Sequence, residues 1–97
     1  MNEYTMQIQA HVDFNNLDVV CQEGVLLIID KPVVHFDFSK VQKPKSNILL
    51  LLTAWVRAAK KHKKDIAFYG ISEKLLSLSR AYGLESILPL TSLSKGL

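Results

Sequence analysis

From residue 33 onward, short apolar segments alternate with helix-favouring segments. The segment VVHFDF, residues 33–38, is rich in β-branched and aromatic side chains and predicts an interior strand. Residues 47–61 contain neither glycine nor proline and predict a helix about 22 Å long, after which IAFYG, residues 66–70, predicts another strand. A strand, a helix and a strand at this spacing predict βαβ units with right-handed crossovers, and hence a mainly parallel sheet packed against helices.

The segments before residue 33 are less uniform. YTMQIQAHV, residues 4–12, alternates apolar and polar side chains and predicts an edge or near-edge strand. Residues 17–24 place apolar side chains at helical spacing, but VLLIID, residues 25–30, looks equally like a buried strand. The pattern therefore leaves this part of the chain open between helix and strand.

The last third of the chain predicts one more helix and a short strand. Ser72 and Glu73 begin a helical segment that runs to Tyr82 and stops at Gly83, and residues 87–90 predict a strand before a tail that frays from about residue 91. The 48% hydrophobic content suits one core. We therefore expect a single α/β domain over residues 1–97, with a mixed, mostly parallel sheet of four to five strands.

Composition narrows the class of protein. The formal net charge of +3 is mild for a protein that binds nucleic acid. The only cysteine, Cys21, cannot form an internal disulfide and has apolar neighbours, so we expect a buried thiol and a reducing compartment. The start lacks the pattern of a signal peptide, and the apolar run ILLLLTAWV is about half as long as a membrane helix requires. We therefore expect a cytoplasmic protein without membrane insertion.

Few residue patterns point to catalysis. His11, His35 and His62 lie in separate elements, and neither a catalytic triad nor a phosphate-binding glycine loop is present. His35 and Asp37 could share one face of a strand, which alone is weak support for a metal site. The basic run AKKHKKD, residues 59–65, should stay solvated at the end of the long helix. We expect no enzyme activity, no cofactor and no metal.

Two specific roles can be assigned to Ser46 from the sequence. It could cap the long helix, a contribution of about 1 kcal/mol, or accept a phosphate that the free amides and the nearby Lys43 and Lys45 would stabilise. In a parallel sheet, the loops that follow strands meet at one edge. We therefore expect residues 43–47 and 70–73 to be neighbours.

Residues 33–90 resemble the second half of a STAS domain, the sulphate-transporter and anti-sigma-antagonist family. Asp37, Ser39 and Ser46 occupy the family's acidic and hydroxyl positions around the strand end and the leucine-rich helix, whereas Lys45 and Asn47 replace its usual aspartate and glycine. Within the family, residues 49–84 are similar to the small stand-alone STAS subunit of Mla-type phospholipid ABC transporters.

The resemblance implies a non-enzymatic subunit that binds the cytoplasmic ATPase of an ABC transporter for phospholipid trafficking, which maintains outer-membrane lipid asymmetry. Such a subunit would lie peripheral to the inner membrane. The expected contact residues are Lys43, Lys45, Ser46, Asn47, Ile71, Ser72 and Glu73. An alternative implied by the same family is an anti-sigma factor antagonist that binds a kinase-type anti-sigma factor and is switched by phosphorylation of Ser46. A third hypothesis is a small ligand-binding module or enzyme using His35 and Asp37.

Overall fold

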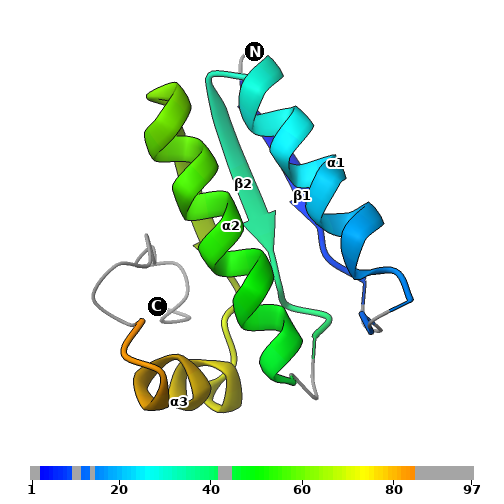
Figure 1. Cartoon of the computed structure of the whole chain (residues 1–97), viewed down its shortest axis with the longest axis vertical. Helices are drawn as coiled ribbons and strands as arrows, with labels where there is room; N and C mark the ends of the chain where they lie inside the picture. The colour runs from blue at the N-terminus through cyan, green and yellow to red at the C-terminus, as the bar shows by residue number, and fades with distance from the viewer. Residues whose placement is uncertain (1–2, 10–11, 14, 42–44, 85–97) are drawn as a thin grey trace.

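The computed structural model describes residues 3–9, 12–13, 15–41 and 45–84. Their elements follow in the order β1 (Glu3–Gln7), α1 (Leu17–Asp30), β2 (Val33–Asp37), α2 (Ser46–His62), β3 (Asp65–Tyr69) and α3 (Glu73–Ala81). The strands form a parallel sheet in the order β1-β2-β3. α1 and α2 lie side by side against one face of this sheet, and α3 lies at its lower end (Figure 1).

The predicted α/β architecture is confirmed, but the strand count is not. β2 is the central strand, β1 is an edge strand, and both pairings are parallel. The described residues contain three strands rather than four to five, and no antiparallel pair that would make the sheet mixed. The strand expected at residues 87–90 lies outside the described residues.

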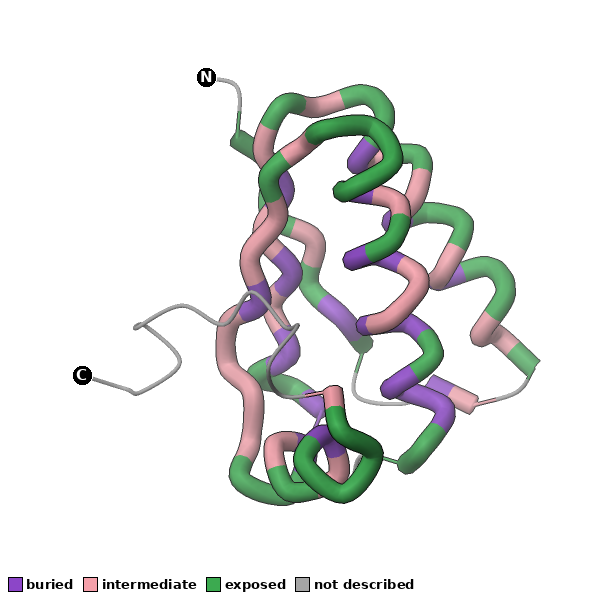
Figure 2. Tube along the Cα trace, turned by 60° about the vertical axis from the view of Figure 1, so that its left-hand side comes forward, coloured by how far each residue is buried: buried purple, intermediate pink, exposed green. Residues whose placement is uncertain are grey.

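The ambiguous segment before β2 is one continuous helix, α1. Its buried residues Val20, Gly24 and Ile28 recur every four positions, which is the spacing of one helix face. Exposed Leu26 and Ile29 lie on another side of the helix, so residues 25–29 form an unbroken apolar run like that of a buried strand. Figure 2 shows buried residues on the sides of α1 and α2 that face the sheet.

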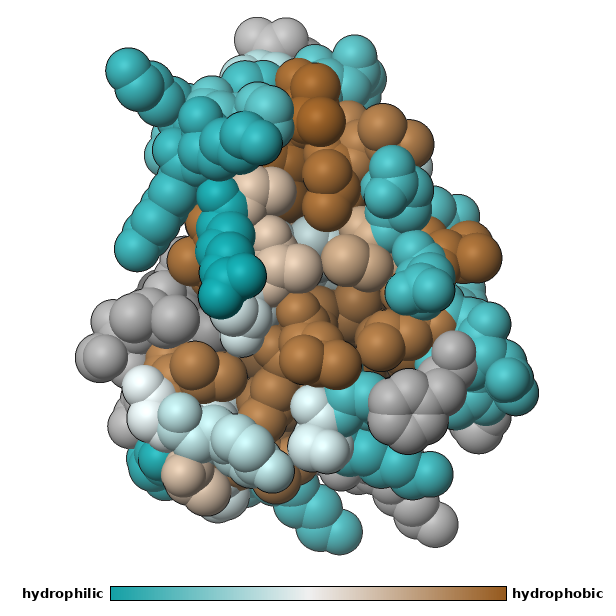
Figure 3. All heavy atoms as spheres, viewed as in Figure 1, coloured by the Kyte–Doolittle hydropathy of each residue, from teal (hydrophilic) through white to brown (hydrophobic). Residues whose placement is uncertain are grey.

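The structure at the helix ends differs from two predictions made from the sequence. α2 begins one residue earlier than expected, with extended Lys45 at the cap position, so Ser46 is the first helical residue and not the N-cap. Lys64 is not solvated like the rest of the basic run, because its ammonium group donates to the carbonyls of Ile28, Ile29 and Lys31 at 3.3, 2.9 and 3.3 Å. The C-terminal end of α2 remains strongly hydrophilic (Figure 3, upper left).

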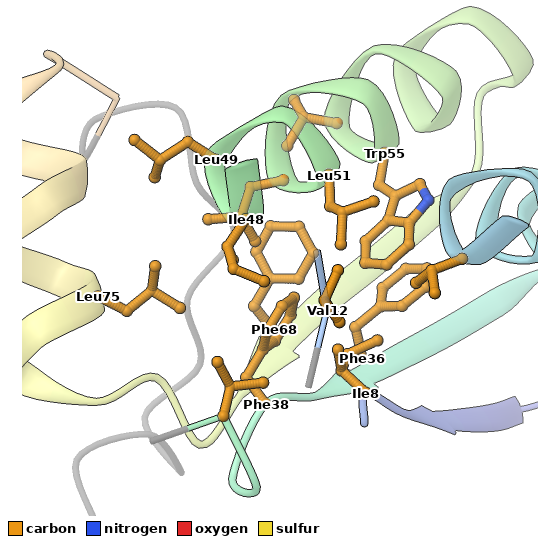
Figure 4. Close-up of a cluster of buried hydrophobic side chains, with 14 of the residues drawn as sticks. Ile8, Val12, Phe36, Phe38, Ile48, Leu49, Leu51, Trp55, Phe68 and Leu75 are labelled. Atoms are coloured by element: carbon orange, nitrogen blue, oxygen red, sulfur yellow. The ribbon is translucent and has the colours of Figure 1, made fainter. Parts of the chain in front are cut away.

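The core is built around Trp55 of α2. Its indole ring is fully buried and stacks on Phe36 of β2, with ring centroids 4.1 Å apart and planes 9° apart (Figure 4). The indole N–H donates to the carbonyl of Cys21 in α1 at 3.1 Å. A Cβ on Gly24 would overlap the indole ring, so glycine at this position lets α1 approach α2 closely. Among the described helices, none has both the length and the apolarity needed to span a membrane.

Candidate partner-binding site

The loops that follow β2 and β3 meet at the lower edge of the sheet. The amide of Phe38 donates to the carbonyl of Tyr69 at 2.8 Å, which extends the pairing of the two strands beyond their assigned ends. Gly70 adopts a positive φ of 69°, and a Cβ there would lie 2.8 Å from the backbone nitrogen of Ser39. Residues 39 and 70 are therefore neighbours, as the geometry of parallel strands requires, whereas the proximity of residues 43–47 to 70–73 stays a prediction.

Ser46 lies exposed at the start of α2, next to exposed Lys45. The first amides of a helix have no partner within the helix, so this end favours negative charge. Ser46 also lines a shallow groove of about 330 Å³, which we call the Ser46 groove. Its walls are formed by Ser46, Asn47, Leu49, Leu50, Thr53, Tyr82 and Leu84.

Two exposed apolar side chains dominate the rim of the Ser46 groove. Leu50 of α2 is 58% exposed and Tyr82, directly after α3, is 60% exposed. Leu50 lies four residues after Ser46, so both side chains project from the same face of the helix. Neither residue was among the predicted contacts. The sequence signal for Leu50 is the run of four leucines at residues 49–52, because four consecutive helical positions cannot all face the core.

The other predicted contact residues lie in different environments. Glu73 is exposed, Ile71 and Ser72 are half-buried, and the hydroxyl of Ser72 accepts from the amide of Leu75 at 3.1 Å as the N-cap of α3. Lys43 lies outside the described residues. Of the predicted contact residues within the described part of the chain, Lys45, Ser46 and Glu73 are therefore exposed.

Asn47, one of the predicted contact residues, lines the Ser46 groove but is mostly buried. It is only 5% exposed, and its side-chain amide donates to the carbonyl of Val12 at 3.2 Å. This bond holds the start of α2 to the segment that precedes α1. The position follows the helix geometry, because Asn47 lies one residue after Ser46 and so points about 100° away from it, toward the core.

His35 and Asp37 share the sheet face opposite to the helices, as predicted. They line an open depression of about 550 Å³ together with Glu3, Thr5 and Tyr69, among others. His35 Nε2 lies 2.7 Å from the Glu3 carboxylate, and its Nδ1 is buried without a hydrogen-bond partner. Because Glu3 occupies one ring nitrogen and protein atoms enclose the other, this imidazole is poorly placed to exchange a proton with a substrate.

Asp37 is held in its ionised form. Partial burial would raise the pKa of this carboxyl, but hydrogen bonds from Ser39 and Gln7 and the positive charge of Lys40 outweigh it, so the pKa lies below its usual value of 3.8. The backbone amide of Ser39 donates to Asp37 Oδ1 at 2.9 Å. The bond closes a turn directly after β2. Across the described residues, no three His, Cys, Asp or Glu side chains gather as a metal site would require.

Cys21 is half-buried rather than fully enclosed. Partial burial, together with the carboxylate of Asp18, raises the pKa of the thiol above its usual 9.0. The thiol therefore remains protonated at neutral pH, and a protonated thiol is a weak nucleophile. Its surroundings are those of a packing residue.

Comparison with known proteins defines the fold more closely. No protein-family model and no curated protein matches the chain. Among solved structures, the anti-sigma factor antagonist SpoIIAA in its unphosphorylated form is similar, with a TM-score of 0.73 over 100% of this chain and 92% of that chain, at 10% sequence identity. The chain therefore has the α/β fold of an anti-sigma factor antagonist, in agreement with the STAS resemblance of residues 33–90.

Proposed function

We propose that this protein is a non-enzymatic STAS-type subunit that binds a partner protein through the Ser46 groove. The observation that carries the proposal is the position of Ser46, exposed in the first turn of α2 beside the exposed apolar side chains of Leu50 and Tyr82. Tyr is enriched at protein interfaces, and the apolar side chain of Leu50 beside it adds surface that a partner can remove from water.

The chemistry of the groove favours a partner with a particular composition. Leu50 and Tyr82 would lose their water on contact, at about 25 cal/mol per Å² of apolar surface buried. Lys45 and the positive end of the α2 dipole favour an acidic side chain on the partner. The expected partner surface is therefore an apolar patch with a carboxylate at its edge.

The partner we propose is the cytoplasmic ATPase subunit of a phospholipid ABC transporter. The support is the similarity of residues 49–84 to the STAS subunit of such transporters, and this segment includes Leu50 and Tyr82. The protein would then act at the cytoplasmic side of the inner membrane without inserting into it. Lys45 and Asn47 differ from the usual residues of the family, so the ATPase surface would carry matching changes.

A second candidate function is that of an anti-sigma factor antagonist. The similarity to SpoIIAA favours it, because that protein has this fold and is described in an unphosphorylated form. A phosphate on Ser46 would be stabilised by the helix amides and by Lys45. It would also place a strongly hydrated dianion beside Leu50, which would oppose docking of an apolar partner surface.

Recovery of the tagged protein from its own cells, followed by mass spectrometry of its partners, tests both candidates. We expect an ABC ATPase to co-purify with the wild type and with the control variant Ser77→Glu, which changes an exposed position on α3. The ATPase should be lost with Ser46→Glu and with Leu50→Asp. A kinase-type anti-sigma factor, with phosphate on the peptide that contains Ser46, would support the second candidate instead. Equal recovery of the ATPase with all variants would contradict a role for the Ser46 groove.

A further inference from the structure

A second apolar groove lies between α1 and the edge strand β1. It measures about 750 Å³, and its apolar side chains are Tyr4, Met6, Leu26, Leu27 and Ile29. Tyr4, Leu26 and Ile29 are 45%, 55% and 46% exposed, so three large apolar residues meet solvent around one depression. Contiguous exposure of this kind marks binding surfaces more often than scattered apolar residues do. We propose that this α1–β1 groove binds a basic amphipathic helix of a partner protein.

The exposed side chains of the α1–β1 groove are not packed in the hydrophobic core. α1 contacts α2 and the sheet through Val20, Gly24 and Ile28, whereas Leu26 and Ile29 project from other sides of the helix. On β1, Tyr4 and Met6 face the helix layer, because their register partners in β2 are the buried Val34 and Phe36. The edge of the sheet therefore keeps part of its helix-facing side uncovered.

Two carboxylates in the α1–β1 groove favour a positively charged partner helix. Glu23 and Asp30 also line the α1–β1 groove and are seven residues apart, which is about 10.5 Å along α1. A partner helix packed along α1 with Lys or Arg seven residues apart would place a cation opposite each carboxylate. Asp30 lies 3.5 Å from the Lys31 ammonium, but its side chain is 71% exposed, so this ion pair can exchange for one with a partner's cation.

A second copy of the chain fits this groove less well than a basic partner. α1 carries Asp18, Glu23 and Asp30 but no Lys, Arg or His, although the whole chain has a net charge of +3. Pairing two copies through α1 would bring like charges together and oppose association. A basic helix would instead neutralise the acidic segment.

The α1–β1 groove is separate from the Ser46 groove. α2 begins at the lower end of the molecule in Figure 1, whereas the C-terminal half of α1, in cyan, lies toward the upper end. Partner binding at one groove does not occupy the other. The inference is therefore independent of which protein binds at Ser46.

Site-specific photocrosslinking in the organism's own cells tests the inference. A benzophenone amino acid replaces Leu26 in the full chain, with the same replacement at exposed Ser77 as the control, and mass spectrometry sequences the crosslinked peptide. We expect a peptide of another protein with apolar residues at helical spacing and Lys or Arg seven residues apart. Reversal of both charges, Glu23→Lys with Asp30→Lys, should lower the crosslink yield roughly tenfold, whereas Ser46→Glu should leave it unchanged.

Four results would overturn the inference. The first is a crosslink yield at Leu26 no higher than at Ser77, and the second is a crosslink to Leu17–Asp30 of a second copy. The third is a crosslink to lipid, and the fourth is a crosslink to a strand or to a helix without basic residues. Circular dichroism of the purified Leu26 replacement shows whether it folds, and exposed Ile29 is the second replacement position if it does not. Loss of the ABC ATPase or of an anti-sigma factor would not affect these outcomes.

Discussion

Gly24 sets the distance between α1 and α2. Alanine is normally favoured over glycine inside a helix by about 1 kcal/mol, but here its methyl group would overlap the buried indole of Trp55. The ring is stacked on Phe36 and hydrogen-bonded to the carbonyl of Cys21, so it has little room to move. Overpacking should therefore dominate over helix propensity.

We expect Gly24→Ala to lower the free energy of unfolding by about 1–3 kcal/mol, measured by urea denaturation. Gln22→Ala on the same helix is the matched control, because Gln22 is exposed and should change stability little. An increase in stability of Gly24→Ala would show that α1 does not pack against Trp55 as closely as described.

Asp37 should make stability depend on pH in acid. Its pKa in the folded protein lies below the usual 3.8, so folding favours the ionised carboxylate. The stabilisation is complete above the unfolded pKa and is lost as the pH falls through the folded pKa. We expect the stability advantage of wild type over Asp37→Asn to be present at pH 5 and to shrink toward about pH 3, in urea unfolding at each pH. An advantage that stays constant over this range would contradict the role of the charge.

The helices α2 and α3 start differently, although a serine stands near the start of each. Ser72 caps α3 by accepting from the amide of Leu75, whereas α2 has Lys45 at its cap position and no side-chain cap. Ser72→Ala should therefore lower the free energy of unfolding by about 1 kcal/mol, and Ser46→Ala should change it by far less. Thermal unfolding of both variants measures the difference. Equal losses would mean that Ser46 also has a capping role.

Local sequence pattern predicts most elements of the fold but leaves α1 open between helix and strand. β2, α2, β3 and α3 follow from periodicity, propensity and the Ser72 cap. α1 stayed ambiguous because an exposed apolar side, with Leu26 and Ile29, fills the gaps in the helical pattern. The same exposed side forms the α1–β1 groove, so the ambiguity in the sequence and the candidate binding surface have one cause.

Tertiary contacts decide the surroundings of residues at the candidate site. Local pattern places Asn47 in the predicted contact loop, but its environment depends on the carbonyl of Val12, which is 35 residues earlier in the chain. Tyr82 joins the Ser46 groove only because α3 folds back beside the start of α2. Lys45 and Ser46, which local pattern predicts beside the start of the long helix, are exposed there, and their contact role stays a prediction.

The whole molecule is held together through Trp55. The side chain belongs to α2, stacks on the central strand β2 and donates a hydrogen bond to α1. Phe38, directly after β2, and Phe68 of β3 extend this aromatic group, with ring centroids 5.7 Å apart. No layer can separate from the others without exposing this cluster, so the elements that contact it should unfold together.

The fluorescence of Trp55, the only tryptophan, should therefore report the same unfolding transition as circular dichroism. We expect the two signals to share one midpoint in urea, with a slope of about 1 kcal/mol per M for a chain of this size. If the circular dichroism signal falls at a urea concentration where the fluorescence is unchanged, a helix detaches before the core opens. Gly24→Ala provides the matched comparison, because its methyl group would disrupt the contact between α1 and Trp55. If the methyl group forces α1 away from the ring, this variant should lose helical signal before the fluorescence changes, and the wild type should not.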